Sequence, residues 1–127
     1  MRRQVMVFGS NREGRHGKGA ALAAKIHHGA IYGQAEGRQG DSYAIITKEL
    51  RRSHPQVTLH EVDIGVRRFL SYAANRPEVD FNVTPIGCGL AGFTPEQIAP
   101  LFIGFTENVK LPAEFLEILD QQPTQST

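Results

Sequence analysis

Two segments of this 127-residue sequence combine glycines with polar side chains in an order suited to phosphate chemistry. The first, residues 9–21, holds Gly14, Gly17 and Gly19 just before an alanine-rich stretch that predicts a helix. Glycine accepts positive φ and lets the backbone approach a ligand closely. The free N–H groups and the positive dipole end of a helix N-terminus attract phosphate. This order therefore predicts a pyrophosphate site, and the alternative is a surface loop whose glycines only make turns.

The second segment, residues 87–92, matches G-x-G-x-x-G by letter. A dinucleotide-binding motif of that form has its helix opening inside the motif. Here Thr94 and Pro95 predict a helix start after the third glycine, with Gln97 completing a capping box. The segment is therefore expected to be an extended cradle whose backbone N–H groups can wrap phosphates. The alternative is a plain connector between a strand and a helix.

Four side chains near these segments have chemistry of their own. Asn11 can offer a donor and an acceptor to a sugar hydroxyl, and Lys48 ends an apolar run, where it either contacts a ligand or is solvated. His16, inside the first loop, could donate to a phosphate or act as a base near neutral pH, or could be an ordinary surface histidine. A nearby helix start could lower the pKa of Cys88, but a small residue packed under a tight loop is the favoured interpretation.

Metal and cofactor sites are not indicated. His27 and His28 are adjacent, so on a helix they point about 100° apart and do not form a same-face metal pair. We therefore predict no metal and no cofactor. The cations Arg12, Arg15 and Lys18 could form a positive rim for a diphosphate, or could be a solvated charge run.

The composition is that of a soluble globular domain. Hydrophobic residues make up 40% and charged residues 21%, and the formal charge of +1 indicates neither nucleic acid nor an acidic membrane as partner. No apolar stretch approaches the roughly 18 to 20 residues of a membrane span, and the apolar run at 5–8 is too short for a signal-peptide core. The single cysteine excludes an internal disulfide and fits a reducing compartment. We therefore expect a cytoplasmic protein.

Apolar runs alternate with helical patterns along the chain. Strands are predicted at 4–9, 43–47, 80–86 and 108–111, helices at 19–28, 57–75, 94–105 and 112–119, and a loop at 29–42. The strongest helix signal is the stripe of apolar residues at spacings of three and four: Leu59, Val62, Val66, Phe69, Leu70 and Ala73. This alternation predicts an α/β sandwich with a largely parallel sheet, in which ligands bind beyond the carboxyl ends of the strands.

Together the two loops resemble the macro-domain family. The first offers an asparagine followed by Gly17-Lys18-Gly19-Ala20-Ala21, and the second, Pro85-Ile86-Gly87-Cys88-Gly89-Leu90-Ala91-Gly92, looks like the family's phosphate loop. The segment Tyr43-Ala44-Ile45-Ile46-Thr47-Lys48 further resembles the branch that includes terminal ADP-ribose protein glycohydrolase. The similarity extends over about residues 5–105, most of the chain.

This resemblance implies a three-layer α/β/α macro-like sandwich with a mixed, largely parallel sheet over residues 1–120, followed by a polar tail at 121–127. It implies ADP-ribose or an ADP-ribosylated protein as partner. The implied ligand-binding residues are Ser10, Asn11, His16, Gly17, Gly19, Ala20, Gly87, Cys88, Gly89, Leu90, Ala91, Gly92 and Phe93. The candidate catalytic residues are Lys48 and Asn11. In the glycohydrolase branch, a lysine at the place of Lys48 attacks the ribose C1″ with help from an aspartate, and Ala91 stands at the aspartate's place.

Three functions follow from these observations. The first is binding of ADP-ribose or a related nucleotide, with hydrolysis of an ADP-ribosyl linkage as a further activity. The second is a non-catalytic module that sequesters a nucleotide or reads a modification, which the missing carboxylate at Ala91 favours. The third is a nucleotide phosphoribohydrolase of the lysine-decarboxylase-like group, whose Pro-Gly-Gly-x-Gly-Thr segment this sequence lacks. The identity of the base stays open: many macro domains have an earlier strand whose aspartate reads the adenine amino group, whereas this sequence reaches its first loop within ten residues of Met1.

Overall fold

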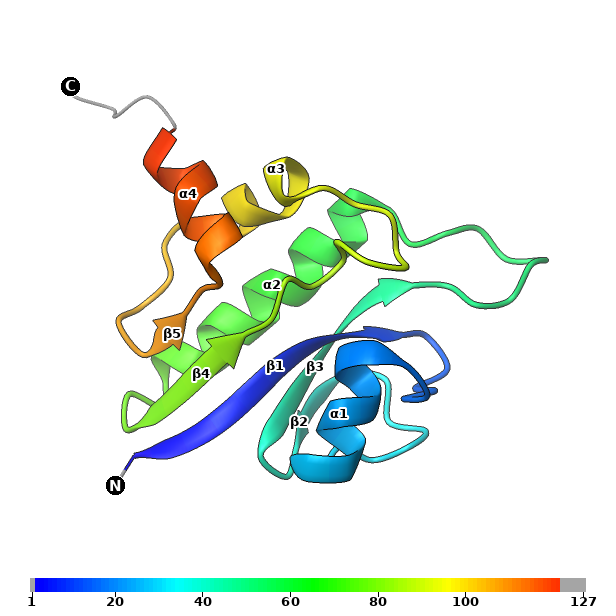
Figure 1. Ribbon diagram of the computed structural model, residues 1–127, viewed down its shortest axis with the longest axis horizontal. Coiled ribbons are helices and arrows are strands. Elements are labelled where there is room, and N and C mark those ends of the chain that lie inside the picture. The colour runs from blue at the N-terminus through cyan, green and yellow to red at the C-terminus, as the bar shows by residue number, and fades with distance from the viewer. Residues whose placement is uncertain (1, 122–127) are drawn as a thin grey trace.

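The computed structural model describes residues 2–121, which form a five-stranded sheet with helices on both faces (Figure 1). The strands lie in the order β2-β3-β1-β4-β5, and all neighbours are parallel except β2 and β3. The strands are β1 (Arg3–Asn11), β2 (Gly37–Gln39), β3 (Ser42–Lys48), β4 (Val79–Val83) and β5 (Val109–Lys110). The helices are α1 (Gly19–His27), α2 (Leu59–Ala74), α3 (Pro95–Ile98) and α4 (Ala113–Gln121), with a 3-10 helix at Ala99–Phe102. The predicted α/β class and mixed sheet are confirmed.

The central strand β1 is apolar on both faces because it is covered on both. Val5 and Val7 belong to a large core shared with α2, whereas Phe8 packs in a smaller core with Ala21 and Ala24 of α1. Figure 1 shows α1 on one side of the sheet and α2 on the other. These three layers are those that the sequence predicted. The small side chains of α1 let this helix lie close to the sheet, so its first turn reaches the edge where β1 ends.

One predicted helix is divided. Residues 94–105 were predicted as a single helix, but α3 ends at Ile98 and a 3-10 helix follows over Ala99–Phe102. Pro100 has no N–H to donate to the carbonyl four residues earlier, which interrupts the α-helical ladder. The predicted start is confirmed: Thr94 Oγ1 accepts from the Gln97 backbone N–H, and the Gln97 side chain accepts from the Thr94 backbone N–H.

Other boundaries shift by a few residues. The helix predicted at 57–75 begins at Leu59, because Thr58 caps it in a second capping box with Glu61. The predicted loop at 29–42 contains the short strand β2, whose antiparallel pairing with β3 is a contact that local patterns do not encode. The strand predicted at 80–86 ends at Val83. No helix among residues 2–121 is long and apolar enough to cross a membrane, and residues 122–127 of the predicted polar tail lie outside the described residues.

Candidate functional site

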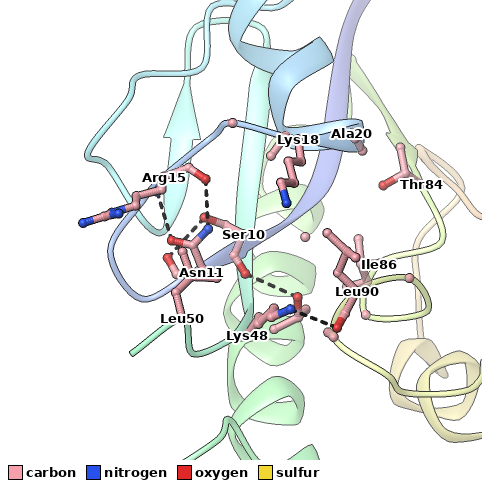
Figure 2. A pocket seen from close by; sticks show the side chains of 18 of the residues that line it. Ser10, Asn11, Arg15, Lys18, Ala20, Lys48, Leu50, Thr84, Ile86 and Leu90 are labelled. Carbon is pink, nitrogen blue, oxygen red and sulfur yellow. Dashed lines mark hydrogen bonds between the residues drawn. The ribbon is translucent and has the colours of Figure 1, made fainter. Parts of the chain in front are cut away.

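A cleft of about 600 Å³ opens where the two glycine loops meet at the carboxyl edge of the parallel strands (Figure 2). The first loop joins β1 to α1, and the second joins β4 to α3. The lining residues are Gly9, Ser10, Asn11, Arg15, Gly17, Lys18, Gly19, Ala20, Ala21, Tyr32, Thr47, Lys48, Leu50, Thr84, Pro85, Ile86, Gly87, Gly89, Leu90 and Ala91. Three of them are cationic, and none carries a carboxylate. Such a one-sign lining concentrates anions in the cleft.

A β-bulge shapes the floor of this cleft. Strand β1 pairs with β3 in steady register up to Ser10, which faces Ile46, and then skips one residue so that Asn11 faces Lys48. The Thr47 hydroxyl, at the skipped position, donates to the Ser10 carbonyl at 3.3 Å. Bulges of this kind redirect side chains at strand ends. The two candidate catalytic residues, Asn11 and Lys48, are therefore cross-strand neighbours at the carboxyl edge of the sheet.

Asn11 holds the conformation of the first loop through hydrogen bonds of its side chain and its backbone. Its side-chain Nδ2 donates to the Arg15 carbonyl and its Oδ1 accepts from the Arg15 backbone N–H, both at 2.9 Å. Its own carbonyl accepts from the Gly14 N–H at 2.9 Å. A sugar hydroxyl would therefore compete with bonds that already hold the loop.

The N-terminus of α1 faces the cleft without a side-chain cap. Lys18 occupies the capping position but makes no side-chain capping bond. Gly19, the first helical residue, has a φ of +55°, which a side chain would strain. Gly17, Gly19 and Ala20 all line the cleft, as the loop order predicted. The first backbone N–H groups of α1 thus remain available to an anion.

His16 does not line the cleft. Its side chain is 0% exposed, its Nε2 lies 3.0 Å from the Gln34 carbonyl, and its ring meets Phe8 edge-on at 5.2 Å between centroids. The contact with a carbonyl requires the proton on Nε2, and Nδ1 has no hydrogen-bond partner. His16 therefore packs on the side of the first loop that faces away from the cleft and connects this loop to the segment of Gln34 and Tyr32. Tyr32 itself lines the cleft.

The second loop reaches the cleft through Gly87, Gly89, Leu90 and Ala91. Gly87 has a φ of +75°, and its carbonyl accepts from the Phe93 N–H at 2.8 Å. Gly92 and Phe93 instead line an adjoining hollow of about 490 Å³, which shares Lys48, Leu90 and Ala91 with the main cleft.

Cys88 lines neither cavity. Its thiol is half-buried and donates to the Ile86 carbonyl at 3.4 Å. Burial raises the pKa of the Cys88 thiol, and the carboxylates of Glu114 and Glu96 raise it further. This is the opposite of the lowering that a helix start would cause, so the geometry fits a packed residue.

Lys48 joins the two sides of the cleft. Its Nζ donates to the Leu90 carbonyl at 3.1 Å, which Figure 2 shows as a bridge from β3 to the second loop. Among residues 2–121, no group of three or more histidine, cysteine, aspartate or glutamate side chains could hold a metal ion.

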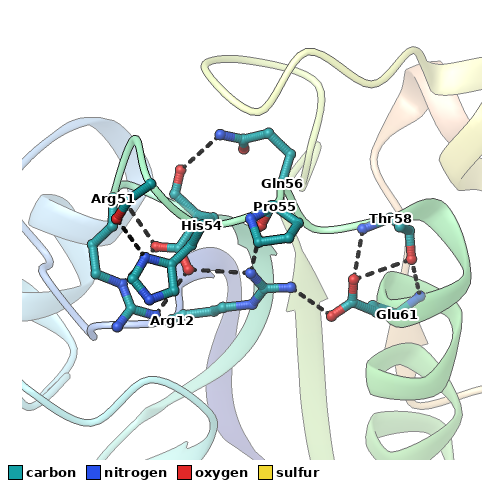
Figure 3. Close-up of polar contacts among 9 residues, drawn as sticks. Arg12, Arg51, His54, Pro55, Gln56, Thr58 and Glu61 are labelled. Carbon is teal, nitrogen blue, oxygen red and sulfur yellow. Dashed lines mark hydrogen bonds and ion pairs between the residues drawn. The ribbon is translucent and has the colours of Figure 1, made fainter.

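Sequence reasoning missed a cluster of charges beside the cleft. Glu49, next to Lys48, has a side chain that is 0% exposed and pairs with both Arg12 and Arg51. Arg12 also pairs with Glu61 and donates to the Pro55 carbonyl (Figure 3). Arg12 was predicted as part of a positive rim, but these partners turn it away from the cleft lining. The one signal for this cluster was a glutamate that continues an apolar strand.

Comparison with known proteins shows what fold the chain has. No protein-family model matches the sequence, and no match was found among curated proteins. Among solved structures, the chain is similar to DarTG from Thermosipho africanus, solved in complex with ADP-ribose, with a TM-score of 0.60. The match covers 88% of this chain and 39% of the DarTG chain, at 17% sequence identity. The two proteins therefore share a fold over most of the present sequence.

Proposed function

We propose that this chain binds ADP-ribose, or a closely related nucleoside diphosphate sugar, in the cleft at the carboxyl edge of its sheet. The resemblance of its two loops to the macro-domain family and the fold that it shares with DarTG support this proposal. The observation that carries the proposal is the lining: two glycine loops, Arg15, Lys18 and Lys48, with no carboxylate. A pyrophosphate carries two negative charges and many acceptor oxygens, which such a lining complements. The complex of DarTG with ADP-ribose supports the same ligand class.

The pyrophosphate is proposed to lie between the N-terminus of α1 and the second loop. The uncapped N–H groups of α1 and the backbone of residues 87–91 approach it from opposite sides. Lys18 and Lys48 flank this position and supply charge. Tyr32 is the one aromatic residue among the lining residues, and the residue is 56% exposed, so its ring is accessible to a planar base.

Calorimetric titration with ADP-ribose, with AMP and NAD as comparison ligands, tests this proposal. We expect micromolar binding of ADP-ribose and much weaker binding of AMP, which lacks the pyrophosphate. Absence of heat at ligand concentrations near a millimolar would remove free ADP-ribose as the ligand.

A variant locates the binding in the cleft. An added Cβ at Gly89 meets no atom within 4 Å, and Gly89 lacks positive φ, so Gly89→Glu should fold normally and place a carboxylate against the pyrophosphate. We expect it to abolish binding. Ile103→Glu adds the same charge at an exposed position outside the cleft lining and serves as the matched control.

Hydrolysis of an ADP-ribosyl linkage is a second candidate, favoured by the presence of Lys48 in the cleft. A lysine nucleophile must lose its proton, for which a neighbouring base is the usual means. The loop has Ala91 where a carboxylate would serve, so binding without turnover is the simpler proposal. Release of ADP-ribose from an ADP-ribosylated protein by the wild type, lost in Lys48→Ala, would establish the hydrolase instead.

A further inference from the structure

The buried carboxylate of Glu49 lies directly beside the cleft without lining it. It follows Lys48 in the chain, and its partner Arg12 follows Asn11. Lys48 and Asn11 face each other across the bulge between β1 and β3. The ion pair between Glu49 and Arg12, at 3.1 Å, thus joins the residues that come immediately after the two candidate catalytic residues.

Both oxygens of Glu49 are fully engaged. Oε1 accepts from Arg12 Nη1 at 3.1 Å and from Arg51 Nη2 at 2.9 Å, and Oε2 accepts from Arg51 Nε at 3.1 Å and from the Arg51 backbone N–H at 2.9 Å. These bonds, those from Arg51 first, hold the pKa of Glu49 well below its usual range. Glu49 is therefore an ionised carboxylate without a free oxygen, which excludes it as a general base for the cleft.

Arg12 extends the connection to a third segment. Its Nη2 donates to Glu61 Oε2 at 2.6 Å, and Glu61 in turn accepts from the Thr58 backbone N–H at the start of α2. Arg12 Nη1 also donates to the Pro55 carbonyl at 2.7 Å, as Figure 3 shows, and its backbone N–H donates to the Lys48 carbonyl at 3.1 Å. The guanidinium of Arg12 therefore connects three places in the chain: the end of β1, the end of β3 and the start of α2.

Stability alone is a poor reason for this arrangement. Taking a carboxylate and a guanidinium out of water costs much of what their attraction returns, and apolar replacements of buried ion pairs often stabilise proteins. A fork-shaped guanidinium between two carboxylates does, however, fix distance and orientation. The cluster lies where the ends of β1 and β3 place the side chains of Asn11 and Lys48 opposite each other.

We propose that Glu49 is a positioning residue of the binding cleft, which acts through Arg12 to hold Lys48 and Asn11 in the geometry that receives the ligand. This inference rests on the proposed function for its binding readout. The structural part of the proposal is that a buried carboxylate orders the first loop and the end of β3. That part does not depend on any ligand and can be tested by hydrogen exchange in the ligand-free protein.

The test compares Glu49→Gln with Glu36→Gln. The control removes a carboxylate that pairs with Arg68 at 3.0 Å on the outer surface, away from the cleft lining. We expect Glu49→Gln to weaken ADP-ribose binding at least tenfold and Glu36→Gln to leave it within twofold. Unchanged binding in Glu49→Gln would overturn the proposal.

Hydrogen exchange in the ligand-free protein supplies the second readout. The backbone N–H groups of Arg12 and Arg15, which donate to the Lys48 carbonyl and to Asn11 Oδ1, should exchange at least tenfold faster in Glu49→Gln. The Phe81 N–H, which donates to the Asn108 carbonyl, reports general stability and should change much less. Equal acceleration at all three amides would mean that Glu49 only stabilises the fold, and would overturn the proposal.

The test also distinguishes a variant that fails to fold from a wild-type protein that does not bind ADP-ribose. If Glu49→Gln does not fold, Arg12→Lys keeps the charge but not the fork, and the same loss of binding and the same local exchange are expected. If the wild type binds no ADP-ribose, the proposed function fails while the exchange measurement still decides the positioning role.

Discussion

The ammonium of Lys48 lies 3.1 Å from the carbonyl of Leu90, so one side chain connects the end of β3 to the exposed tip of the second glycine loop. These residues are 42 positions apart in the sequence. The bond divides the main cleft from the adjoining hollow, since both residues line both cavities. A bound pyrophosphate offers the same ammonium a charged acceptor, which makes a stronger hydrogen bond than a neutral carbonyl does.

Replacing Lys48 with methionine should therefore weaken binding more than it weakens the fold. Loss of a charge-assisted hydrogen bond corresponds to about 1.5–3 kcal/mol, or roughly tenfold to a hundredfold in Kd. Calorimetry with ADP-ribose measures the affinity, and urea unfolding measures the stability. Lys110→Met, which removes an ammonium that donates to the Glu107 carbonyl outside the cleft, is the control. Equal affinity of Lys48→Met and wild type would contradict the proposed role.

Asn11→Ala should disturb the first loop itself. The change removes the donor and the acceptor that bond Arg15, and leaves both backbone groups of Arg15 without their partner. We expect a loss of about 1–3 kcal/mol in the free energy of unfolding, together with weaker ligand binding. Asn75→Ala removes a single exposed bond to the Ser71 carbonyl and should cost less. An Asn11→Ala protein as stable as the wild type would show that these bonds do not order the loop.

The contribution of Glu49 to stability should depend on pH. Its pKa is lowered in the folded protein, first by the Arg51 side chain. A group of this kind stabilises the fold fully above its unfolded pKa, about 4.3 for glutamate, and loses that contribution as the pH falls. The difference in urea midpoint between wild type and Glu49→Gln should therefore be constant from pH 6 to 8 and shrink below about pH 4.3. A difference that persists unchanged at pH 3 would argue against an ionised Glu49.

Cys88 should alkylate slowly at neutral pH despite its place in a glycine loop. Burial, then Glu114 and Glu96, raise its pKa, so less of the reactive thiolate is present than in an exposed cysteine. The rate with iodoacetamide, followed by mass spectrometry, is expected to lie below that of free cysteine at pH 7.5 and to rise as the pH increases. A rate above that of free cysteine would indicate a lowered pKa.

Tyr32 should contribute to affinity for nucleotides but not for ligands without a base. Stacking of a base on an aromatic ring is worth about 1–3 kcal/mol, so Tyr32→Ala is expected to raise the Kd for ADP-ribose by roughly fivefold to a hundredfold. Tyr32→Phe keeps the ring and should bind like the wild type. Ribose 5-phosphate, which has no base, should bind the wild type and Tyr32→Ala equally. An equal loss for both ligands in Tyr32→Ala would point to a disturbed first loop instead.

Much of the fold was predictable because its signals are local. The apolar run at residues 5–8 indicated a strand buried on both faces, and Thr94, Pro95 and Gln97 marked the start of α3 from neighbouring residues alone. The α/β/α fold that the resemblance implied is confirmed, and the solved structure of DarTG shares its fold over 88% of this chain. The closer resemblance to the glycohydrolase branch and the contact of individual loop residues with a ligand stay predictions.

Some differences between the predicted and the observed elements arose where two local signals competed. Pro100 stands inside an otherwise helical pattern, and its missing N–H decided that the predicted helix divides at Ile98. The antiparallel strand β2 differs in kind, since its three residues become a strand only by pairing with β3. A three-residue polar segment that begins with a glycine and is followed by another carries no periodicity from which to predict a strand.

Local signals in the sequence were enough to predict the order of the strands and helices other than β2, the two loops at one edge of the sheet, and the lack of a carboxylate at Ala91. Backbone propensities, caps and apolar periodicity act between near neighbours, so they can be read along the chain. Which polar side chains face the cleft depended on tertiary contacts: His16 is buried against Phe8 and Gln34, and Arg12 turns to Glu49. Those choices depend on the shape and charge of segments tens of residues away, which meet only when the sheet has formed.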